Sequence, residues 1–387
     1  MSANVQADIV VESAVEETPR VAQLRGVFDL DAAHPAHGAT QRLAWSVALP
    51  LGERPWHIGL ITGPSGCGKS TIARRLWPAA LRPQPPEQWP AAQALIDAFP
   101  AALGVKQIIG LLSSVGFSSP PAWLRPYRVL STGQQFRADL ALALAQALTA
   151  ESAPPAPPLV VFDEFTSTVD RTVAQIGSAA VAKAIRAHKL QFVAVTCHAD
   201  VIDWLQPDWT YDPATGFFDW RCLRRRPGVP LALVRCHREA WRLFAPHHYL
   251  SHQLLASAHC FLATWHDAPV CFSAWLPFVG KSAQPTWREH RTVVLPDYQG
   301  VGIGNTISAT LASAYRALGK KVVSTTTHPA MIAHRRRSPL WRLARAPNLA
   351  ATGDIVQHAE GRLTAGFEYV GPALPLLQAK ALLCVPS

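Results

Sequence analysis

The stretch Gly63-Pro64-Ser65-Gly66-Cys67-Gly68-Lys69-Ser70-Thr71 follows an apolar run, Ile58–Thr62, that we interpret as a buried strand. A GxxxxGK[ST] pattern between a strand and a helix is typical of a phosphate-binding loop. Its glycines let backbone N–H groups curl around a triphosphate, Lys69 offers a cation to the β and γ groups, and Ser70 offers a hydroxyl to Mg²⁺. The stretch therefore predicts an ATP site bounded by Gly63, Gly66, Gly68, Lys69, Ser70 and Thr71.

A pair of carboxylates follows a second apolar strand, Leu159–Phe162. Asp163 is predicted to hold the Mg²⁺ shell together with Ser70, and Glu164 to orient or deprotonate the attacking water. A third apolar strand is expected over Gln191–Thr196. Strands that alternate with helices predict a parallel α/β sheet.

Three further motifs lie in a fixed order around these carboxylates. Leu130–Gln135 (LSTGQQ) precedes a helix expected over Arg137–Leu148, Ser167–Asp170 follows the carboxylates, and Thr196–His198 ends the third strand. In this order and spacing, over about residues 25–215, the chain resembles the ABC-type ATPase family.

The resemblance implies roles for four more residues. Ser131 and Gly133 belong to the signature motif, which in the family contacts the γ-phosphate held by the opposite subunit. Asp170 lies in the segment that communicates across the dimer, and His198 is the switch histidine. The resemblance therefore predicts an ATP hydrolase that forms a homodimer when ATP is bound.

The chain also departs from the family's transporters. Only about 60 residues separate Lys69 from Ser131, Thr132 replaces a signature glycine, and no run of eighteen apolar residues is present. We therefore expect a soluble, cytoplasmic ATPase without membrane contact. The glutamine of the family's glutamine loop stays open among Gln84, Gln88, Gln93 and Gln107.

A second glycine-rich turn lies in Val293–Asn305, where an apolar strand runs into QGVGIGN. A turn of this kind before a helix forms a pyrophosphate cradle. The spacing is not GxGxxG, and no acidic residue follows about 20 residues later, so a dinucleotide fold is disfavoured. The motif and the order of elements instead resemble the GNAT acetyltransferase family, which implies acetyl-CoA or another acyl-CoA as cofactor.

By this resemblance the backbone of the strand end meets the acyl-pantetheine arm, and the turn holds the pyrophosphate. The strand residues are Val293, Val294 and Leu295, and the turn residues are Gln299, Gly300, Val301, Gly302, Ile303, Gly304 and Asn305. The expected base is Glu289, with His290 as its rival. The family's tyrosine acid is not found, which leaves His334, water or no group for the protonation step. Arg335–Arg337 are candidates for binding the 3′-phosphate of CoA or an anionic acceptor.

Composition limits the class of protein. A length of 387 residues suits two domains, and seven cysteines without a CxxC pair suit a reducing compartment. The net charge is +10; residues 221–387 hold 20 Lys/Arg against 7 Asp/Glu, whereas residues 1–220 hold 16 against 19. This imbalance predicts an anionic partner of the C-terminal half, with nucleic acid as one candidate.

The resulting organisation has four parts. Residues 1–25 are an arm or edge strand, 26–215 an ABC-type P-loop NTPase domain, 216–230 a linker, and 231–387 a GNAT α/β domain with a helix expected over 239–255. We predict an ATPase fused to an acyl-CoA-dependent acyltransferase acting on a nucleic acid or nucleobase. Two alternatives stay open: an ATP-switched nucleic-acid clamp with a non-catalytic GNAT-like domain, and an ATP-gated small-molecule N-acetyltransferase.

Overall fold

The computed structural model describes most of the chain and divides it into two compact units. The described residues are 4–14, 16–30, 40–81, 89–150, 157–221, 228–248, 253–278, 284–349 and 363–383. The units interleave along the sequence: the first comprises residues 1–83, 150–168 and 185–225, and the second comprises 84–149, 169–184 and 226–387. Each unit has its own sheet with helices, so the predicted α/β fold class is confirmed.

The first unit is built on a five-stranded sheet in the order β4-β5-β3-β6-β7. Its strands are β3 (Ile58–Thr62), β4 (Leu159–Phe162), β5 (Gln191–Thr196), β6 (Trp209–Asp212) and β7 (Phe217–Trp220). All neighbours pair in parallel except β6 and β7. Every residue of β5 is buried, as expected for a parallel strand covered on both faces. Since Thr62 pairs with Thr196, β3 and β5 end level with each other.

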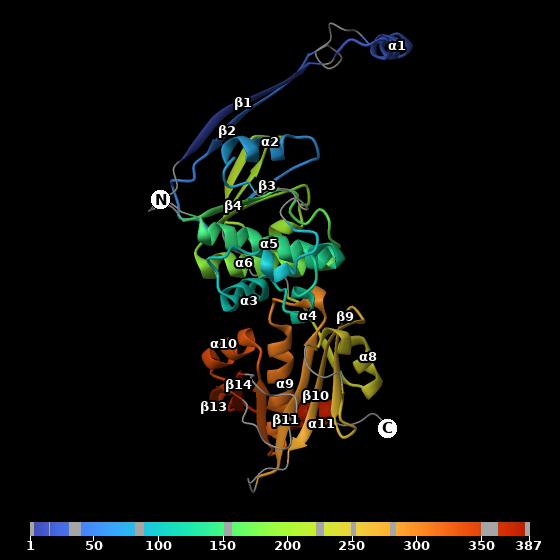
Figure 1. Ribbon diagram of the computed structural model, residues 1–387, viewed down its shortest axis with the longest axis vertical. Helices are drawn as coiled ribbons and strands as arrows, with labels where there is room; N and C mark the ends of the chain where they lie inside the picture. Colours follow the sequence, from blue (N-terminus) through green and yellow to red (C-terminus); the bar gives the residue numbers. More distant parts are fainter. Residues whose placement is uncertain are drawn as a thin grey trace. The chain divides into compact units, whose positions relative to one another are not determined.

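An antiparallel ribbon and three helices complete the first unit. The ribbon pairs β1 (Val5–Ala14) with β2 (Thr40–Leu49), and Figure 1 shows the two strands side by side. The helices are α1 (Pro19–Phe28), α2 (Lys69–Leu76) and α7 (Val201–Leu205). Apolar side chains of the ribbon, including Ile9 and Val47, join the core beneath β3 and β6.

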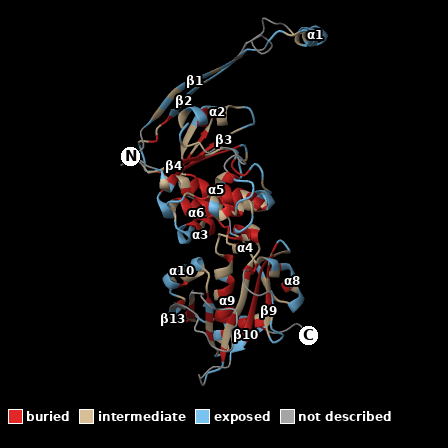
Figure 2. Ribbon diagram, viewed as in Figure 1, coloured by how far each residue is buried: buried red, intermediate tan, exposed pale blue. Residues whose placement is uncertain are grey.

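A group of helices forms one part of the second unit. They are η1 (Leu95–Ala98), α3 (Val105–Ser114), α4 (Pro120–Trp123), η2 (Tyr127–Val129), α5 (Thr132–Thr149) and α6 (Arg171–His188), whose last turn falls in the first unit. Figure 2 shows α5 and α6 as mainly buried. The carboxylate of Asp139, inside α5, accepts hydrogen bonds from Trp89 (2.7 Å) and Tyr127 (2.8 Å), so its burial is compensated.

A seven-stranded sheet forms the other part of the second unit, in the order β13-β14-β12-β11-β10-β9-β8. Its strands are β8 (Ala232–Arg235), β9 (His259–Trp265), β10 (Ala268–Phe278), β11 (Thr286–Val294), β12 (Lys321–Thr326), β13 (Trp341–Leu349) and β14 (Leu363–Tyr369). Only β11 and β12 pair in parallel, and their pairing runs from Thr286 opposite Lys321 to Glu289 opposite Ser324.

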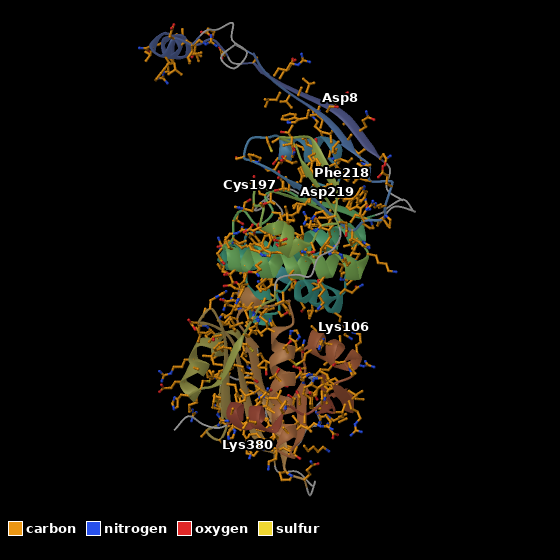
Figure 3. The ribbon with its side chains drawn as sticks, turned by 180° about the vertical axis from the view of Figure 1, so that it is seen from behind. Asp8, Lys106, Cys197, Phe218, Asp219 and Lys380 are labelled. Atoms are coloured by element: carbon orange, nitrogen blue, oxygen red, sulfur yellow. The ribbon has the colours of Figure 1, made fainter. Side chains whose placement is uncertain are left out.

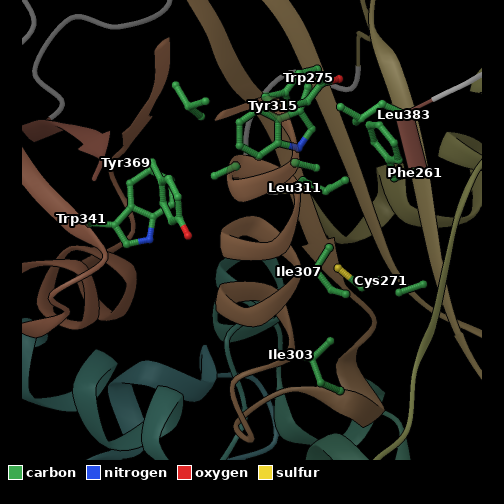
Figure 4. Packing of buried hydrophobic residues seen from close by; sticks show 14 of the residues in the cluster. Phe261, Cys271, Trp275, Ile303, Ile307, Leu311, Tyr315, Trp341, Tyr369 and Leu383 are labelled. Atoms are coloured by element: carbon green, nitrogen blue, oxygen red, sulfur yellow. The ribbon is translucent and has the colours of Figure 1, made fainter. Parts of the chain in front are cut away.

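Helices cover both faces of this sheet. The helical elements are η3 (Arg238–Ala240), α8 (Trp241–Phe244), η4 (Ala245–His247), η5 (Pro296–Tyr298), α9 (Ile303–Ala317), α10 (Pro329–Arg337) and α11 (Leu376–Leu383). In Figure 4 the buried face of α9, with Ile307 and Leu311, packs toward Cys271 and Trp275. On the other face α8 packs against Phe272.

Three elements differ from expectation. The helix expected over 239–255 is wrong: short turns end at His247, because Pro246 cannot donate to a continuing helix. Strand β7 lies inside the expected linker 216–230 and pairs with β6, and β1 gives the expected arm a paired strand. Within the described ranges no helix is long and apolar enough to cross a membrane.

Candidate functional site

The glycine-rich loop of the first unit leads directly into α2. Gly68 is the N-cap residue in the left-handed region (φ 95°, ψ 9°), and no side chain caps the helix. The Lys69 ammonium donates to the carbonyl oxygens of Gly63 (2.9 Å) and Pro64 (2.6 Å), so it lies over the loop. Backbone N–H groups at a helix N-terminus together with a nearby cation make a site for an anion.

The conformation of Gly68 is enforced by its surroundings. A Cβ atom there would lie 2.3 Å from Cζ2 of Trp45, whose indole N–H donates to the carbonyl of Cys67 at 3.0 Å. Trp45 belongs to β2, so the ribbon supports the loop from outside the sheet. No motif in the sequence predicts this role of Trp45.

A hydroxyl and a carboxylate meet beside the loop. The Ser70 hydroxyl donates to Oδ1 of Asp163 at 2.8 Å, and the same oxygen accepts from the backbone N–H of Glu164 at 3.0 Å. Ser70 lies in the first turn of α2 and Asp163 follows β4, so two elements far apart in sequence supply this pair. Hydroxyl and carboxylate oxygens are the hard donors that Mg²⁺ prefers, and the pair fits that ion.

The next carboxylate, that of Glu164, is exposed, and the backbone of this residue is strained. Glu164 has φ 52°, which is uncommon for a residue other than glycine, and its side chain is exposed. The Phe165 N–H donates to the carbonyl of Val195 at 2.8 Å, which anchors the turn to β5. The Ser167 hydroxyl donates to Oε2 of Glu164 at 2.6 Å and orients the carboxylate.

His198 lies just beyond β5, at the same edge of the sheet. Its backbone N–H donates to the Thr196 hydroxyl at 3.2 Å, and its side chain is half-buried. Neighbouring Cys197 is exposed (Figure 3). Because β3, β4 and β5 are parallel, the loop, the carboxylate pair and His198 all follow carboxyl ends of adjacent strands. Open α/β sheets bind their ligands at this edge.

The remaining residues of the first prediction belong to the second unit. Ser131 and Gln134 exchange hydrogen bonds at the start of α5, in the manner of a capping box. Asp170 accepts from the N–H groups of Thr172 and Val173 and so caps α6. Gly133 is buried, and a Cβ atom there would lie 3.2 Å from a carboxylate oxygen of Asp297.

The second glycine-rich turn leads into α9. Gly302 is its N-cap residue, again left-handed (φ 96°, ψ 8°), and no side chain caps the helix. A Cβ atom on Gly302 would meet nothing within 4 Å, whereas one on Gly304 would lie 3.1 Å from Val294. The first turn of α9 therefore offers backbone N–H groups beside open space at Gly302.

The start of this turn is packed against protein. Gln299 accepts from the Ser118 N–H at 2.7 Å and donates to the Ser119 hydroxyl at 3.4 Å and the Val294 carbonyl at 2.9 Å. A Cβ atom on Gly300 would lie 2.6 Å from Cα of Gly116. The donor and acceptor atoms of the Gln299 side chain are thus engaged within the second unit.

Arg137, from the middle of α5, fixes the same turn. Its guanidinium donates to the carbonyls of Gly116 (3.1 Å), Pro296 and Asp297 (2.6 Å). Burial lowers the pKa of Arg137 to about 10, so it keeps its charge at neutral pH. No motif predicts this role, although a charged residue within a leucine- and alanine-rich helix is a usable signal.

Glu289 lies in a buried polar network. Its carboxylate accepts from the hydroxyls of Thr292 (2.6 Å) and Ser324 (2.6 Å) and from Nη2 of Arg335 (2.7 Å). Burial raises the pKa of Glu289, but Arg335 and these hydrogen bonds outweigh it, and the pKa lies below its usual value. The side chain is only 6% exposed, so an acceptor molecule could reach it only after a rearrangement.

Arg335 is fully buried and stacks on Trp341, with the guanidinium carbon 4.2 Å from the ring centroid. It also donates to the hydroxyls of Ser324 and Ser308. The interpretation of Arg335 as a ligand of the CoA 3′-phosphate is therefore wrong, because its donors serve this network. Burial lowers the pKa of His290 to about 4, so that imidazole is neutral at pH 7.

Comparisons with known proteins give structural similarity alone. No protein-family model matches, and no curated protein matches either. The solved structures include a dimeric bacterial ABC transporter cassette (16% identity, 44% of this chain, 89% of that chain, TM-score 0.34). A second is a Bacillus subtilis acetyltransferase in complex with CoA (13% identity, 38% of this chain, 98% of that chain, TM-score 0.28). A third is the IAA acetyltransferase of Bacillus cereus (14% identity, 36% of this chain, 99% of that chain, TM-score 0.28). The chain is thus similar in part to ABC cassettes and in part to acetyltransferases.

Proposed function

We propose that the first unit binds Mg²⁺-ATP and hydrolyses it. The observation that carries this proposal is the convergence of Lys69, the Ser70–Asp163 pair and Glu164 at the carboxyl edge of one parallel sheet. Lys69 and the N–H groups of the loop bind the phosphates. Ser70 and Asp163 would hold Mg²⁺, which neutralises phosphate charge when bound.

Glu164 has the position of the group that handles water. Its carboxylate follows the metal-binding Asp163 directly, is exposed, and is oriented by Ser167. It can therefore orient a water molecule at the γ-phosphate or accept a proton from it. His198, from the neighbouring strand, is the second candidate for contact with that phosphate.

The test is ATP binding by calorimetry and phosphate release on the full chain, with and without Mg²⁺. Lys69→Ala should remove ATP binding, because the ammonium and the loop act together. Arg74→Ala is the matched control, since it removes a cation from an exposed position of the same helix. Equal ATP affinity in the two variants would contradict the proposed site.

We also propose that two copies of the chain assemble when ATP is bound. This follows from the ABC-type resemblance, in which Ser131 and Gly133 complete the site of the opposite subunit. Ser131 is exposed at the N-terminus of α5, where it can meet another molecule. Sedimentation of the Glu164→Gln variant with saturating ATP tests this, and a persistent monomer would contradict it.

For the second unit we propose a CoA thioester site at the turn before α9. The supporting observation is the left-handed Gly302, which opens the helix N-terminus to an anion. The reaction is acyl transfer: the acceptor forms a new bond to the acyl carbon, the thioester bond breaks, and CoA leaves as the thiol. Calorimetry with CoA tests the site, with Gly302→Val expected to lose binding and Gly319→Val, at a similarly open left-handed glycine, expected to retain it.

We propose that the acyl acceptor is an anionic polymer. The C-terminal half carries the excess of basic residues, and on α10 and β13 Arg336, Arg337, Arg342 and Arg345 are exposed. This surface supports a nucleic acid as acceptor, or as the ligand of a non-catalytic clamp. The test measures the binding of DNA and RNA across a salt series, and the consumption of acetyl-CoA. Binding with consumption indicates a nucleic-acid acceptor, and binding without consumption indicates a clamp. Consumption without nucleic-acid binding indicates a small-molecule acceptor.

A further inference from the structure

A pocket of about 270 Å³ lies in the second unit, between the helical segment 96–124 and the carboxyl end of β12. Its wall is made of apolar atoms. The lining residues are Ile96, Ile109, Pro120, Trp123, Leu124, Thr327, His328 and Pro329. Five of these eight residues thus come from the helical segment that precedes α5, and the other three from the stretch between β12 and the first residue of α10.

The pocket adjoins the turn proposed to hold CoA. Ser118 and Ser119 bond the side chain of Gln299 within that turn, and the next residue, Pro120, lines the pocket. On the opposite wall, Thr327 directly follows β12. The described pairing of β12 with β11 ends at Ser324, so the pocket lies just beyond the paired part of the two parallel strands.

The chemistry of the wall selects the ligand. A charged or strongly polar group would lose its hydration here without gaining hydrogen-bond partners, which is costly. Burial lowers the pKa of His328 to about 4, so the one imidazole of the wall is neutral at pH 7. An apolar group of matching volume is the ligand that gains free energy by entering.

We propose that this pocket binds the hydrocarbon chain of an acyl-CoA longer than acetyl-CoA. The proposal rests on the CoA site proposed for the second unit and names its substrate class. A methylene group occupies roughly the 30 Å³ share of a water molecule, so the pocket has room for on the order of eight. An acetyl group alone would leave most of that volume unfilled.

The test is calorimetry of the full chain with acetyl-, butanoyl-, hexanoyl- and octanoyl-CoA. Each buried methylene should tighten binding about fourfold. Octanoyl-CoA, with six more methylenes than acetyl-CoA, should therefore bind at least a hundredfold more tightly, allowing for incomplete burial. Equal affinity for all four thioesters would overturn the pocket assignment and leave the CoA site standing.

A matched pair of variants on α3 locates the effect. Ile109→Phe adds roughly the volume of one methylene to the wall and should reduce the gain for octanoyl-CoA, while leaving acetyl-CoA binding unchanged. Val105→Phe makes the same kind of change at an exposed position of the same helix, 60% exposed, and should keep the gain. The same gain in Ile109→Phe would overturn the proposal.

Two further outcomes concern the CoA site itself and the folding of the Ile109→Phe variant. Loss of binding of every thioester and of CoA by the parent protein would mean that the CoA site itself is wrong, and the pocket proposal would fall with it. If Ile109→Phe does not fold, judged by circular dichroism, the chain-length series on the parent protein decides the matter alone.

Discussion

The two glycine-rich turns have nearly the same backbone and different chemistry. Each follows a strand and places a left-handed glycine at a helix N-cap, Gly68 with φ 95° and Gly302 with φ 96°, and neither helix has a side-chain cap. The first turn is joined by a cation, a hydroxyl and two carboxylates, whereas the second is joined by the packing contacts of Gln299 and Arg137. The two turns thus present helix N-terminal N–H groups in the same backbone geometry, and they differ in the side chains around them.

The largest expected effect tests the chemistry of the first turn. Glu164→Gln removes the carboxylate proposed to handle water but keeps its size and its contact with Ser167. ATP hydrolysis should fall by about a hundredfold or more, because proton transfer or orientation is lost, while ATP affinity stays within about twofold. Asp203→Asn, at an exposed carboxylate of α7, is the control and should hydrolyse at the parent rate. Undiminished hydrolysis in Glu164→Gln would show that another group handles the water.

The second effect tests whether Glu289 acts as a base or as an anchor. Glu289→Gln leaves the buried Arg335 without its charged partner, which should destabilise the fold by about 3 kcal/mol. Glu368→Gln breaks the ion pairs of a half-buried carboxylate with Arg342 and Lys321, which are more open to solvent, and should cost about 1 kcal/mol or less. Denaturant unfolding measures both. A fully stable Glu289→Gln variant that has lost acyl transfer would instead favour the role of base.

The same carboxylate makes stability depend on pH. Its pKa is lower in the folded state than in the unfolded chain, where it is about 4.3. Its stabilisation is therefore complete above that value and is lost as pH falls through the folded pKa. The difference in unfolding free energy between the parent and Glu289→Gln should accordingly shrink below pH 4.

The third effect tests the contacts that hold the second turn. Arg137→Met removes the donors to three backbone carbonyls while preserving much of the apolar stem. Loss of charged hydrogen bonds should cost about 2–3 kcal/mol of stability and weaken CoA binding, because η5 is no longer fixed. Arg128→Met, at an exposed position, is the control. An unchanged CoA affinity in Arg137→Met would show that the turn holds its shape without α5.

Much of this arrangement was predictable because motifs and periodicity are local signals. The strands β3, β4 and β5 agree with the expected ranges, and the α/β class is confirmed. The roles expected for Lys69, Ser70 and Asp163 stay predictions, with side chains that lie where such roles require. Local sequence does specify a turn and the residues that follow it.

Long-range packing was not predictable from single motifs. Nothing in the sequence around Gly116 indicates that it packs against Gly300, or that Arg137 reaches the carbonyl of Asp297 160 residues away. Arg335 was misassigned for the same reason, since a run of three arginines suggests a solvated surface. Its partner Glu289 lies on β11, whereas Arg335 lies on α10, and only the folded unit brings the two together.

The smallest effect compares the two glycines directly. Gly68→Ala and Gly302→Ala each force a Cβ atom into the left-handed region, which costs roughly 1–2 kcal/mol. At Gly68 the Cβ atom would also meet Trp45 at 2.3 Å, so the loop must move and ATP affinity should fall. At Gly302 the space is open, so stability should fall only by the conformational cost, as it should in the control Gly319→Ala (φ 72°). Thermal unfolding with and without ATP or CoA separates the three variants. An ATP affinity of Gly68→Ala equal to that of the parent protein would mean that Trp45 yields easily, and that the two turns differ in side chains alone.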